Sequence, residues 1–583
     1  MEQIWLSSAD ELMRIGKSKE YPQDGRYALR RDIAGDCGTL PAVCGIELDG
    51  QGHAIGPLSS PLFLSLEDAT IRNLTLELNV AQSAPSSDGL GGLCCSACRS
   101  LIDGVETRGR INGAADAGGL AGSLMDCDVV SCKNTANVGA EKCGAGGICS
   151  YANNTNFLKC INTGNVSAVA VEDETSRVGG ITGTMLATWD KLAAVYSITE
   201  CLNEGEISGG KSVGGIAGYI RGSDPCYEKN PAQSEKARLE IAGCVNRGDV
   251  HPSQDCTGLM FGGIVGEGVC FLKISNCRNA GGVWAHGSVG GIIGDARNPT
   301  WKFAEKSGDS YIAPIPAPRE RFTVSPEKDY TASGCNLVEN CENLGSVTQT
   351  FSANAANAMA GGIAGSVMYI GSIAKCTNRG TVCAHGDSVG GIAGKLLTAV
   401  ISGSSNAANV TSEGGAVGGI VGCADRVLDS GAYPLPKGRN RAGAFECINT
   451  AEVKGGADAV GGIAGALRNG SVVLRCENAQ SVSSVGSFVG GIVGMTSCES
   501  VSCNKIESCA AQKANLAGAY HVHRILGGWD SSASALLEDN TASSDITIIG
   551  DNTTDSGYIY ANEPVARDDP NLAEDAMHGG CYN

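Results

Sequence analysis

The chain has 583 residues, of which 83 are glycine and only 5% are aromatic, and its formal net charge is −19. So many small residues predict a thin, tightly wound structure, and the negative charge argues against binding to nucleic acids or anionic membrane surfaces, because phosphates are repelled. No apolar run approaches the roughly 18–20 residues of a membrane-spanning helix, and Met1 to Trp5 show neither the basic nor the apolar region of a signal peptide.

Residues 1–80 are predicted to form an N-terminal cap. Ile4 to Leu12 have the pattern of a short strand followed by a helix, with Ser8 and Glu11 at capping-box spacing. Two further strand-like segments follow at 27–33 and 48–55. A repeat structure needs such a cap because its first repeat has an uncovered edge and core.

Residues 81–510 form an array of one repeated unit. The unit reads Cys-x-Asn-x-Gly-x-Val, then a short spacer, then Val-Gly-Gly-Ile-x-Gly, as in Cys160 to Val166 followed by Val178 to Ile181. The closest Gly-Gly pairs are 28 or 29 residues apart, and longer spacings contain insertions. Val and Ile alternate with polar or small residues, which is the period of β-strands. We therefore predict an all-β fold, a parallel β-helix of about 28-residue coils with three short strands each, in which Gly and Asn supply the bends.

In such a fold, equivalent repeat positions stack into columns. The cysteine column is made of Cys132, Cys160, Cys201, Cys244, Cys277, Cys341, Cys376, Cys447 and Cys476. The asparagine column is made of Asn134, Asn162, Asn203, Asn246, Asn279, Asn343, Asn378, Asn406, Asn449 and Asn478. A set of disulfides would not place nine cysteines at equivalent positions, so these cysteines are expected to be buried free thiols. The asparagines are expected to form hydrogen bonds with one another and with the backbone at a bend.

Residues 511–583 lose the repeat and are predicted to be a C-terminal cap, with a strand at 545–549 and a short helix from Pro570 to Met577. The array also carries long insertions, at 184–200, 219–243, 295–340 and 423–446, all after the Gly-Gly-Ile strand. They are expected to leave the coil at one corner and to gather along one side.

The insertion from Asp295 to Asn340 is rich in aromatic residues for this chain. Trp, Tyr and Arg are frequent anchors of interfaces. We therefore predict a partner-binding surface there, carried by Trp301, Tyr311, Arg319 and Arg321. The alternative is that these aromatic residues only hold the long insertions against the coil. Tyr196, Tyr219 and Phe445 are counted with other insertions, and both interpretations apply to them as well.

Several groups of residues could carry chemistry. Glu206 and Asp249 occupy the same position in successive repeats, close enough for a pair of catalytic carboxylates, but they are expected to point to solvent. His286 and His385 are equivalent too, with one repeat between them, which is too far for a shared metal. His521 and His523 lie on one predicted strand, without a third ligand.

Cys94, Cys95 and Cys98 have a zinc-like spacing, but no second Cys-x-x-Cys follows at the distance of a zinc finger. Since the polar groups of this sequence are repeated rather than gathered at one place, we expect no catalytic residues, no metal and no cofactor.

The repeats resemble those of the GLUG-motif family of bacterial surface proteins. The motif appears as Gly119-Leu120-Ala121-Gly122, with Ile in place of Leu in copies such as Gly215 to Gly218. The segments from Ile4, from Tyr27 and from Leu48 are similar to the leader strands of that family. The resemblance implies a glycine-rich β-solenoid that is secreted or on the cell surface, although this chain shows neither signal peptide nor anchor. Some members carry a zinc protease domain, but His-Glu-x-x-His does not occur here.

Three functions remain open from the sequence. The first is a non-enzymatic, adhesin-like or surface structural protein that binds a protein or glycan partner through its insertions, without nucleic acid and without membrane insertion. The second is a carbohydrate-active β-helix enzyme, a polysaccharide lyase or glycoside hydrolase. The third is a structural spacer or a fibre like those of phages. We favour the first, because an enzyme needs unlike polar groups that converge.

Overall fold

The computed structural model describes residues 2–82, 89–169, 176–187, 195–222, 238–253, 259–269, 272–297, 336–350, 358–368, 371–426, 442–498, 504–512, 515–529 and 535–551. The chain divides into two compact units. The first contains Met1–Ser223, Lys236–Glu267 and Cys277–Gly281, and the second contains Asp224–Glu235, Gly268–Asn276 and Gly282–Asn583. Among the described residues α1 (Ala9–Leu12) is the only helix. The described part of the chain therefore has no helix that is long and apolar enough to cross a membrane.

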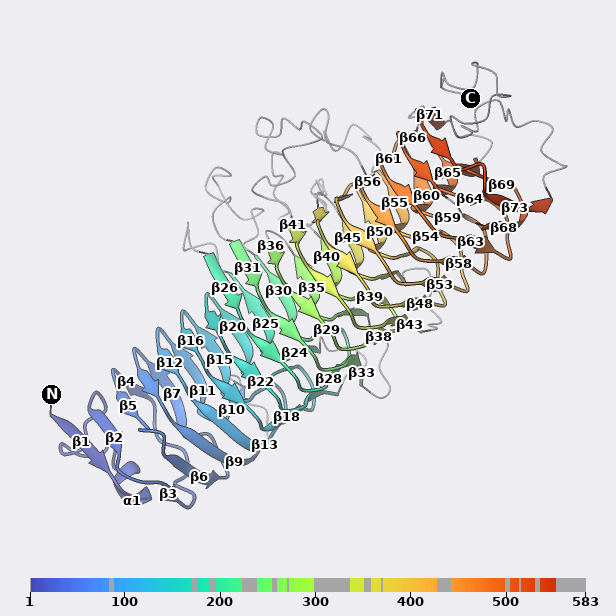
Figure 1. Cartoon of the computed structure of the whole chain (residues 1–583). Coiled ribbons are helices and arrows are strands. Elements are labelled where there is room, and N and C mark those ends of the chain that lie inside the picture. Colours follow the sequence, from blue (N-terminus) through green and yellow to red (C-terminus); the bar gives the residue numbers. More distant parts are fainter. Residues whose placement is uncertain are drawn as a thin grey trace, which may run out of the picture. The chain divides into compact units, whose positions relative to one another are not determined.

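Each unit is a parallel β-helix, which confirms the predicted fold class. One coil of the first unit consists of β26 (Val195–Thr199), β27 (Leu202–Asn203), β28 (Ile207–Gly209), β29 (Ser212–Gly214) and β30 (Ala217–Arg221). These strands pair in parallel, in the same order, with β21 (Asn156–Leu158), β22 (Ile161–Asn162), β23 (Val166–Ala168), β24 (Arg177–Gly179) and β25 (Thr182–Leu186) of the preceding coil (Figure 1). The expectation of three strands per coil was wrong, because extra bends divide the coil into five shorter strands.

The second unit repeats this plan. Its strands β46 (Gly371–Ala374), β47 (Thr377–Asn378), β48 (Val382–Ala384), β49 (Val389–Gly390) and β50 (Ala393–Leu397) form one coil. They pair in parallel with β51 (Val400–Ser402), β52 (Ser405–Asn406), β53 (Val410–Ser412), β54 (Val417–Gly418) and β55 (Val421–Asp425). The backbone groups at the edge of each coil are therefore satisfied by the next coil.

The strands of residues 1–80 belong to the same stack. β1 (Gln3–Leu6) pairs with β2 (Arg26–Leu29), which pairs with β5 (Glu47–Asp49) and through it with β8 (Thr70–Arg72) and β12 (Leu101–Asp103). The predicted strand and capped helix are confirmed, since the side chain of Ser8 accepts a hydrogen bond from the backbone N–H of Glu11 at the start of α1. A closing role for residues 1–80 and 511–583 stays a prediction. The predicted C-terminal helix lies outside the described residues.

The cysteine column lies inside the coils. All nine of its cysteines are buried free thiols, as expected. The thiol of Cys201 donates a hydrogen bond to the carbonyl of Thr199 (3.4 Å) and accepts one from the backbone N–H of Cys160 in the preceding coil (3.4 Å). Cys509 continues the column after Cys476. The sequence motif missed Cys509 because the Asn and Gly that should follow it are absent.

We expect the column thiols to resist alkylation in the native protein and all nine to react once the protein is denatured without reductant. Burial raises the pKa of Cys132 and Cys476 well above the ordinary value, so little reactive thiolate forms. The exposed thiol of Cys383 is the internal control, since it should react in the native state. Mass spectrometry after iodoacetamide treatment measures both sets, and fewer than nine labelled column cysteines in the denatured protein would contradict the expectation.

The asparagine column is also internal, and every one of its members is 0% exposed. In the first unit Asn203 shows the pattern: its Nδ2 donates to the carbonyl of Gly205 and to Oδ1 of Asn246, both at 2.8 Å, while its Oδ1 accepts from Nδ2 of Asn162. In the second unit the bonds from Asn343 to Asn378 and on to Asn406 are 2.9 Å long. The column bonds itself as predicted, but in the core instead of at a wet corner.

The bend before the column cysteine is made by Gly or Asn in some coils only. The residue there takes a positive φ, as Gly243 (65°) and Asn276 (54°) do, but so do Lys159 (56°) and Glu200 (54°), whereas none of the column asparagines does so. Gly is required for a different reason. A Cβ on Gly180, the second Gly of its pair, would lie 2.2 Å from the carbonyl oxygen of Gly215 and 2.5 Å from Cγ of Asn203. The Gly-Gly pair therefore lets the backbone approach the asparagine column.

Candidate functional site

The residues predicted to bind a partner, Trp301, Tyr311, Arg319 and Arg321, lie outside the described residues, so their role stays a prediction. The insertion that carries them is flanked by β40 (Ile293–Arg297) and β41 (Asn336–Glu339), both in the second unit. What the structure describes is the base of this insertion.

All the long insertions of the second unit start and end at one corner of the coil. Residues 298–335 connect β40 with β41, and residues 427–441 connect β55 with β56 (Gly443–Phe445). β40 and β55, which come before the corner, belong to one sheet, and β41 and β56, which come after it, belong to a second sheet (Figure 1). The corresponding gap of the first unit, 188–194, lies between the equivalent strands β25 and β26. The expectation of a common corner is confirmed.

Polar contacts hold the base of the largest insertion. The carboxylate of Asp295, which is 3% exposed, accepts a hydrogen bond from the hydroxyl of Ser366 (2.5 Å) and pairs with the guanidinium of Arg297. Arg297 ends β40, so the ion pair lies where the insertion begins. A buried carboxylate with a cation and a hydroxyl as partners is a structural anchor at the end of β40.

The aromatic residues counted with other insertions are parts of strands. Tyr196 lies in β26, Tyr219 in β30 and Phe445 in β56, and each is less than 10% exposed. Phe445 packs with Val400, Val472 and Leu474 in one apolar cluster. Their assignment to insertions was wrong, because the insertions were counted from the Gly-Gly motif and the strands beyond it are longer than that motif.

One of the two carboxylates that resembled a catalytic pair has another partner. Glu206 and Asp249 are exposed, as expected, and Oε1 of Glu206 lies 2.5 Å from Nε2 of His251. An imidazole thus lies beside the first carboxylate.

The histidines that resembled metal ligands have separate partners. Nδ1 of His286 lies 2.8 Å from the hydroxyl of Thr350, and Nδ1 of His385 lies 2.8 Å from the carboxylate of Glu413. The ring of His521 stacks on Phe488 with 4.8 Å between the centroids. In the part of the chain that the structure describes, no three His, Cys, Asp or Glu side chains are placed to hold a metal ion.

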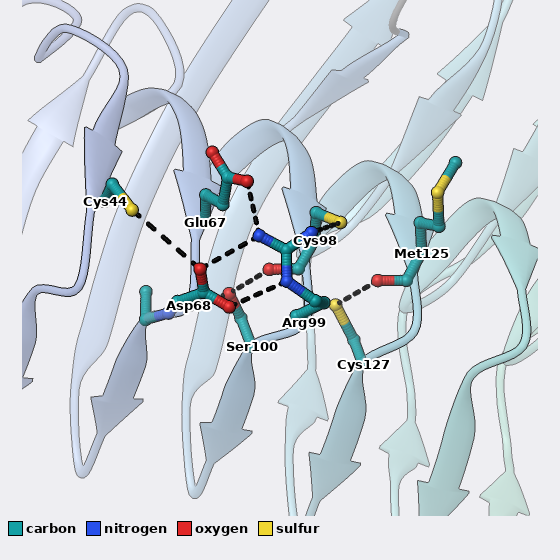
Figure 2. Close-up of polar contacts among 9 residues, drawn as sticks. Cys44, Glu67, Asp68, Cys98, Arg99, Ser100, Met125 and Cys127 are labelled. Atoms are coloured by element: carbon teal, nitrogen blue, oxygen red, sulfur yellow. Dashed lines mark hydrogen bonds and ion pairs between the residues drawn. The ribbon is translucent and has the colours of Figure 1, made fainter.

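The cysteines with zinc-like spacing point to different surroundings. Cys94 is fully buried in β11 (Cys94–Cys98), whereas the thiol of Cys98 lies on the outer side, 3.4 Å from a nitrogen of Arg99. Figure 2 shows the corner around this arginine, where the guanidinium binds the carboxylates of Glu67 and Asp68. The guanidinium holds the pKa of Asp68 below its usual value.

The thiol of Cys44, 3.9 Å from the carboxylate of Asp68, has a raised pKa, chiefly because of desolvation and then because of the charges of Glu67 and Asp68. A raised pKa makes it a poor nucleophile. The corner in Figure 2 is therefore an exposed ion-pair network that links neighbouring coils, and water screens it.

One group of polar and aromatic side chains in the first unit, of which Tyr151 is exposed, was missed by the sequence analysis. Tyr151, Thr184 and Tyr219 pair in register across β20 (Cys149–Asn153), β25 and β30. The guanidinium carbon of Arg177, in β24, lies 3.9 Å from the centroid of the Tyr219 ring. We call Tyr151, Arg177, Thr184 and Tyr219 the arginine–tyrosine patch. A signal existed in the sequence, because both tyrosines follow Gly-Gly-Ile at the same distance.

No family model matches this sequence, and no curated protein matches it. The resemblance to GLUG-motif proteins therefore rests on the motifs alone, and membership of that family stays a prediction, as do secretion and attachment to a cell surface.

Proposed function

We propose that this protein is a non-enzymatic β-solenoid, adhesin-like or structural at a surface, that binds a protein or glycan partner through its insertions. The common corner of the insertions carries the proposal. Residues 298–335 and residues 427–441 connect strands of the same two sheets, so both insertions leave their coils at equivalent positions. The resemblance to GLUG-motif proteins agrees with an extracellular or cell-surface location.

The surface chemistry of the described coils also favours binding over catalysis. The outer ion pairs join equivalent positions of neighbouring coils, as Arg72 with Asp49 and Arg247 with Glu204 do. Such pairs repeat along the coil instead of converging on one reacting group. A carbohydrate-active enzyme remains the second candidate, and it predicts the release of new reducing or unsaturated ends from a glycan.

Replacing residues 298–335 by a short Gly-Ser link should leave folding nearly unchanged and remove most of the binding to the partner. The next coil connects β45 (Ala364–Met368) with β46 by residues 369–370 alone, so two to four residues are enough for the link. Ala296 and Arg297 must stay, because Ala296 is 1% exposed in β40 and Arg297 binds Asp295. Circular dichroism checks folding, and arrays of glycans and extracellular proteins measure binding.

The matched control is the same replacement of residues 427–441, which leave the coil at the same corner. If the variant lacking 298–335 unfolds, the insertion is part of the packing and the proposed surface is wrong. If that variant folds and binds every partner as well as the wild type does, the binding site lies elsewhere. New chain ends in any glycan incubated with the intact protein would favour the enzyme instead.

A further inference from the structure

Arg177 in the arginine–tyrosine patch has no ionic partner among the described residues. Its guanidinium makes no hydrogen bond there, and its buried Nε has no acceptor. Arg99, Arg108 and Arg247 differ, because each of them lies against a carboxylate. Within the described ranges, the charge of Arg177 is therefore not balanced by a carboxylate.

Tyr219 packs against this half-buried arginine. Tyr219 is 9% exposed, and the guanidinium lies over the face of its ring, which is a favourable cation–π arrangement. Tyr151 is 37% exposed and pairs in register with Thr184 of the following coil, to which Arg177 also belongs. Burial raises the pKa of the Tyr151 phenol, and the charge of Arg177 opposes that rise.

The next carboxylate along the row is not available to Arg177. Glu267 is 8% exposed, and it accepts a hydrogen bond from the hydroxyl of Ser212 (2.8 Å). The patch thus combines a planar cation with the exposed ring and hydroxyl group of Tyr151, while Thr184 is buried. A guanidinium binds a carboxylate through two parallel hydrogen bonds, and an aromatic face attracts the C–H groups of a sugar ring, which carry partial positive charge.

We propose that the arginine–tyrosine patch binds a sugar that carries a carboxylate, with Arg177 on the carboxylate and Tyr151 against the ring. A single arginine beside a tyrosine ring suits one carboxylate. Polyphosphates and nucleic acids require several basic groups, and the negative chain repels them. The site lies on the coil of the first unit, so it goes beyond the insertion surface of the proposed function, and the two can fail independently.

The test is isothermal titration calorimetry of the full chain with tetragalacturonate and with its methyl ester, which keeps the rings and loses the charge. The acid should bind at least tenfold more tightly than the ester. Arg177→Gln should weaken binding of the acid at least tenfold, because it removes charge-assisted hydrogen bonds. The affinity of Arg177→Lys for the acid should lie between those of the wild type and Arg177→Gln, because lysine keeps the charge but cannot form the two parallel hydrogen bonds. The control Arg247→Gln, which breaks the exposed ion pair with Glu204, should leave the affinity for the acid unchanged.

Circular dichroism and the melting temperature show whether each variant keeps the fold, and Tyr151→Ala offers a second variant outside the cation–π contact. The proposal is wrong if the wild type binds neither ligand, or if folded Arg177→Gln binds the acid as well as the wild type does. It is also wrong if inorganic phosphate competes as strongly as the sugar acid, since the site would then take any anion.

The sequence before Arg177 contains Glu172, Asp173 and Glu174, which lie outside the described residues. If the wild type fails to bind and only the triple variant E172Q/D173N/E174Q binds the acid, these carboxylates occupy the patch. The proposal of a sugar site in the native protein would then be overturned. If the insertion variant lacking 298–335 binds tetragalacturonate normally, the patch is independent of the insertion surface.

Discussion

Replacing Gly180 by alanine should destabilise the first unit by about 3 kcal/mol, because overpacking a site that cannot relax has costs of this order. The new Cβ would lie 2.2 Å from the carbonyl oxygen of Gly215 in the next coil and 2.5 Å from Cγ of Asn203. Gly215 is tied to the following coil by the bond from its N–H to the carbonyl of Gly262 (3.2 Å), and Asn203 is tied to Asn246, so neither residue can move without disturbing the stack. Urea denaturation followed by circular dichroism measures the effect as a lower midpoint.

Gly139→Ala is the matched control in the same unit. The nearest atom to its added Cβ is Oδ1 of Asn112 at 3.0 Å, the end of a side chain, and the next atoms are 3.9 Å away. We expect a change within about 0.5 kcal/mol. If the two variants have equal stability, the second Gly of the pair is not required by the approach of the backbone to the asparagine column.

Replacing Asn203 by alanine should have a similar cost, about 3 kcal/mol, because it leaves the carbonyl of Gly205 and Oδ1 of Asn246 buried without their donor. Asn203→Asp should be worse at neutral pH. It has nearly the same shape, but it replaces the amide donor by a buried negative charge next to an acceptor. The comparison separates the loss of hydrogen bonds from the loss of volume, and the same urea denaturation measures it.

The matched control for Asn203 is Asn165→Ala, in the same coil as Asn162. Asn165 is exposed, and its Oδ1 accepts a hydrogen bond from the backbone N–H of Glu206 (3.1 Å). Water can replace that bond, so we expect a cost well below that of Asn203→Ala. Equal costs for the two asparagines would show that the internal column contributes no more than surface contacts do.

These variants matter for function because the coils place both candidate surfaces. Neighbouring coils set the spacing of the insertions and of the outward side chains, so a loosened stack would disturb each binding surface. The stability of a repeat protein is approximately a sum over repeats and their interfaces. A substitution such as Gly180→Ala should therefore disturb the adjoining arginine–tyrosine patch more than it disturbs the insertion at 298–335, which belongs to the second unit.

The sequence by itself determined the parallel β-helix, the cysteine and asparagine columns and the corner of the insertions. These features follow from register: each coil covers the one before it, so equal positions in the repeat must stack, and a repeat counted along the chain becomes a column in space. The burial of Cys201 and the bonding of Asn203 to its neighbours were predictable for this reason. Cys509 was missed, because it lies where the repeat motif has decayed.

Only the tertiary structure showed the features that depend on the angles between short strands. The sequence could not show that Lys159 and Glu200 take the positive φ or that Asn203 points into the core, because a bend that moves by one residue turns a side chain to the other face. Tyr219 was assigned to an insertion because β30 extends beyond the Gly-Gly motif from which the insertion was counted. The contact of Arg177 with Tyr219 joins two sheets and two coils, and only the packing of the coils brings these side chains together.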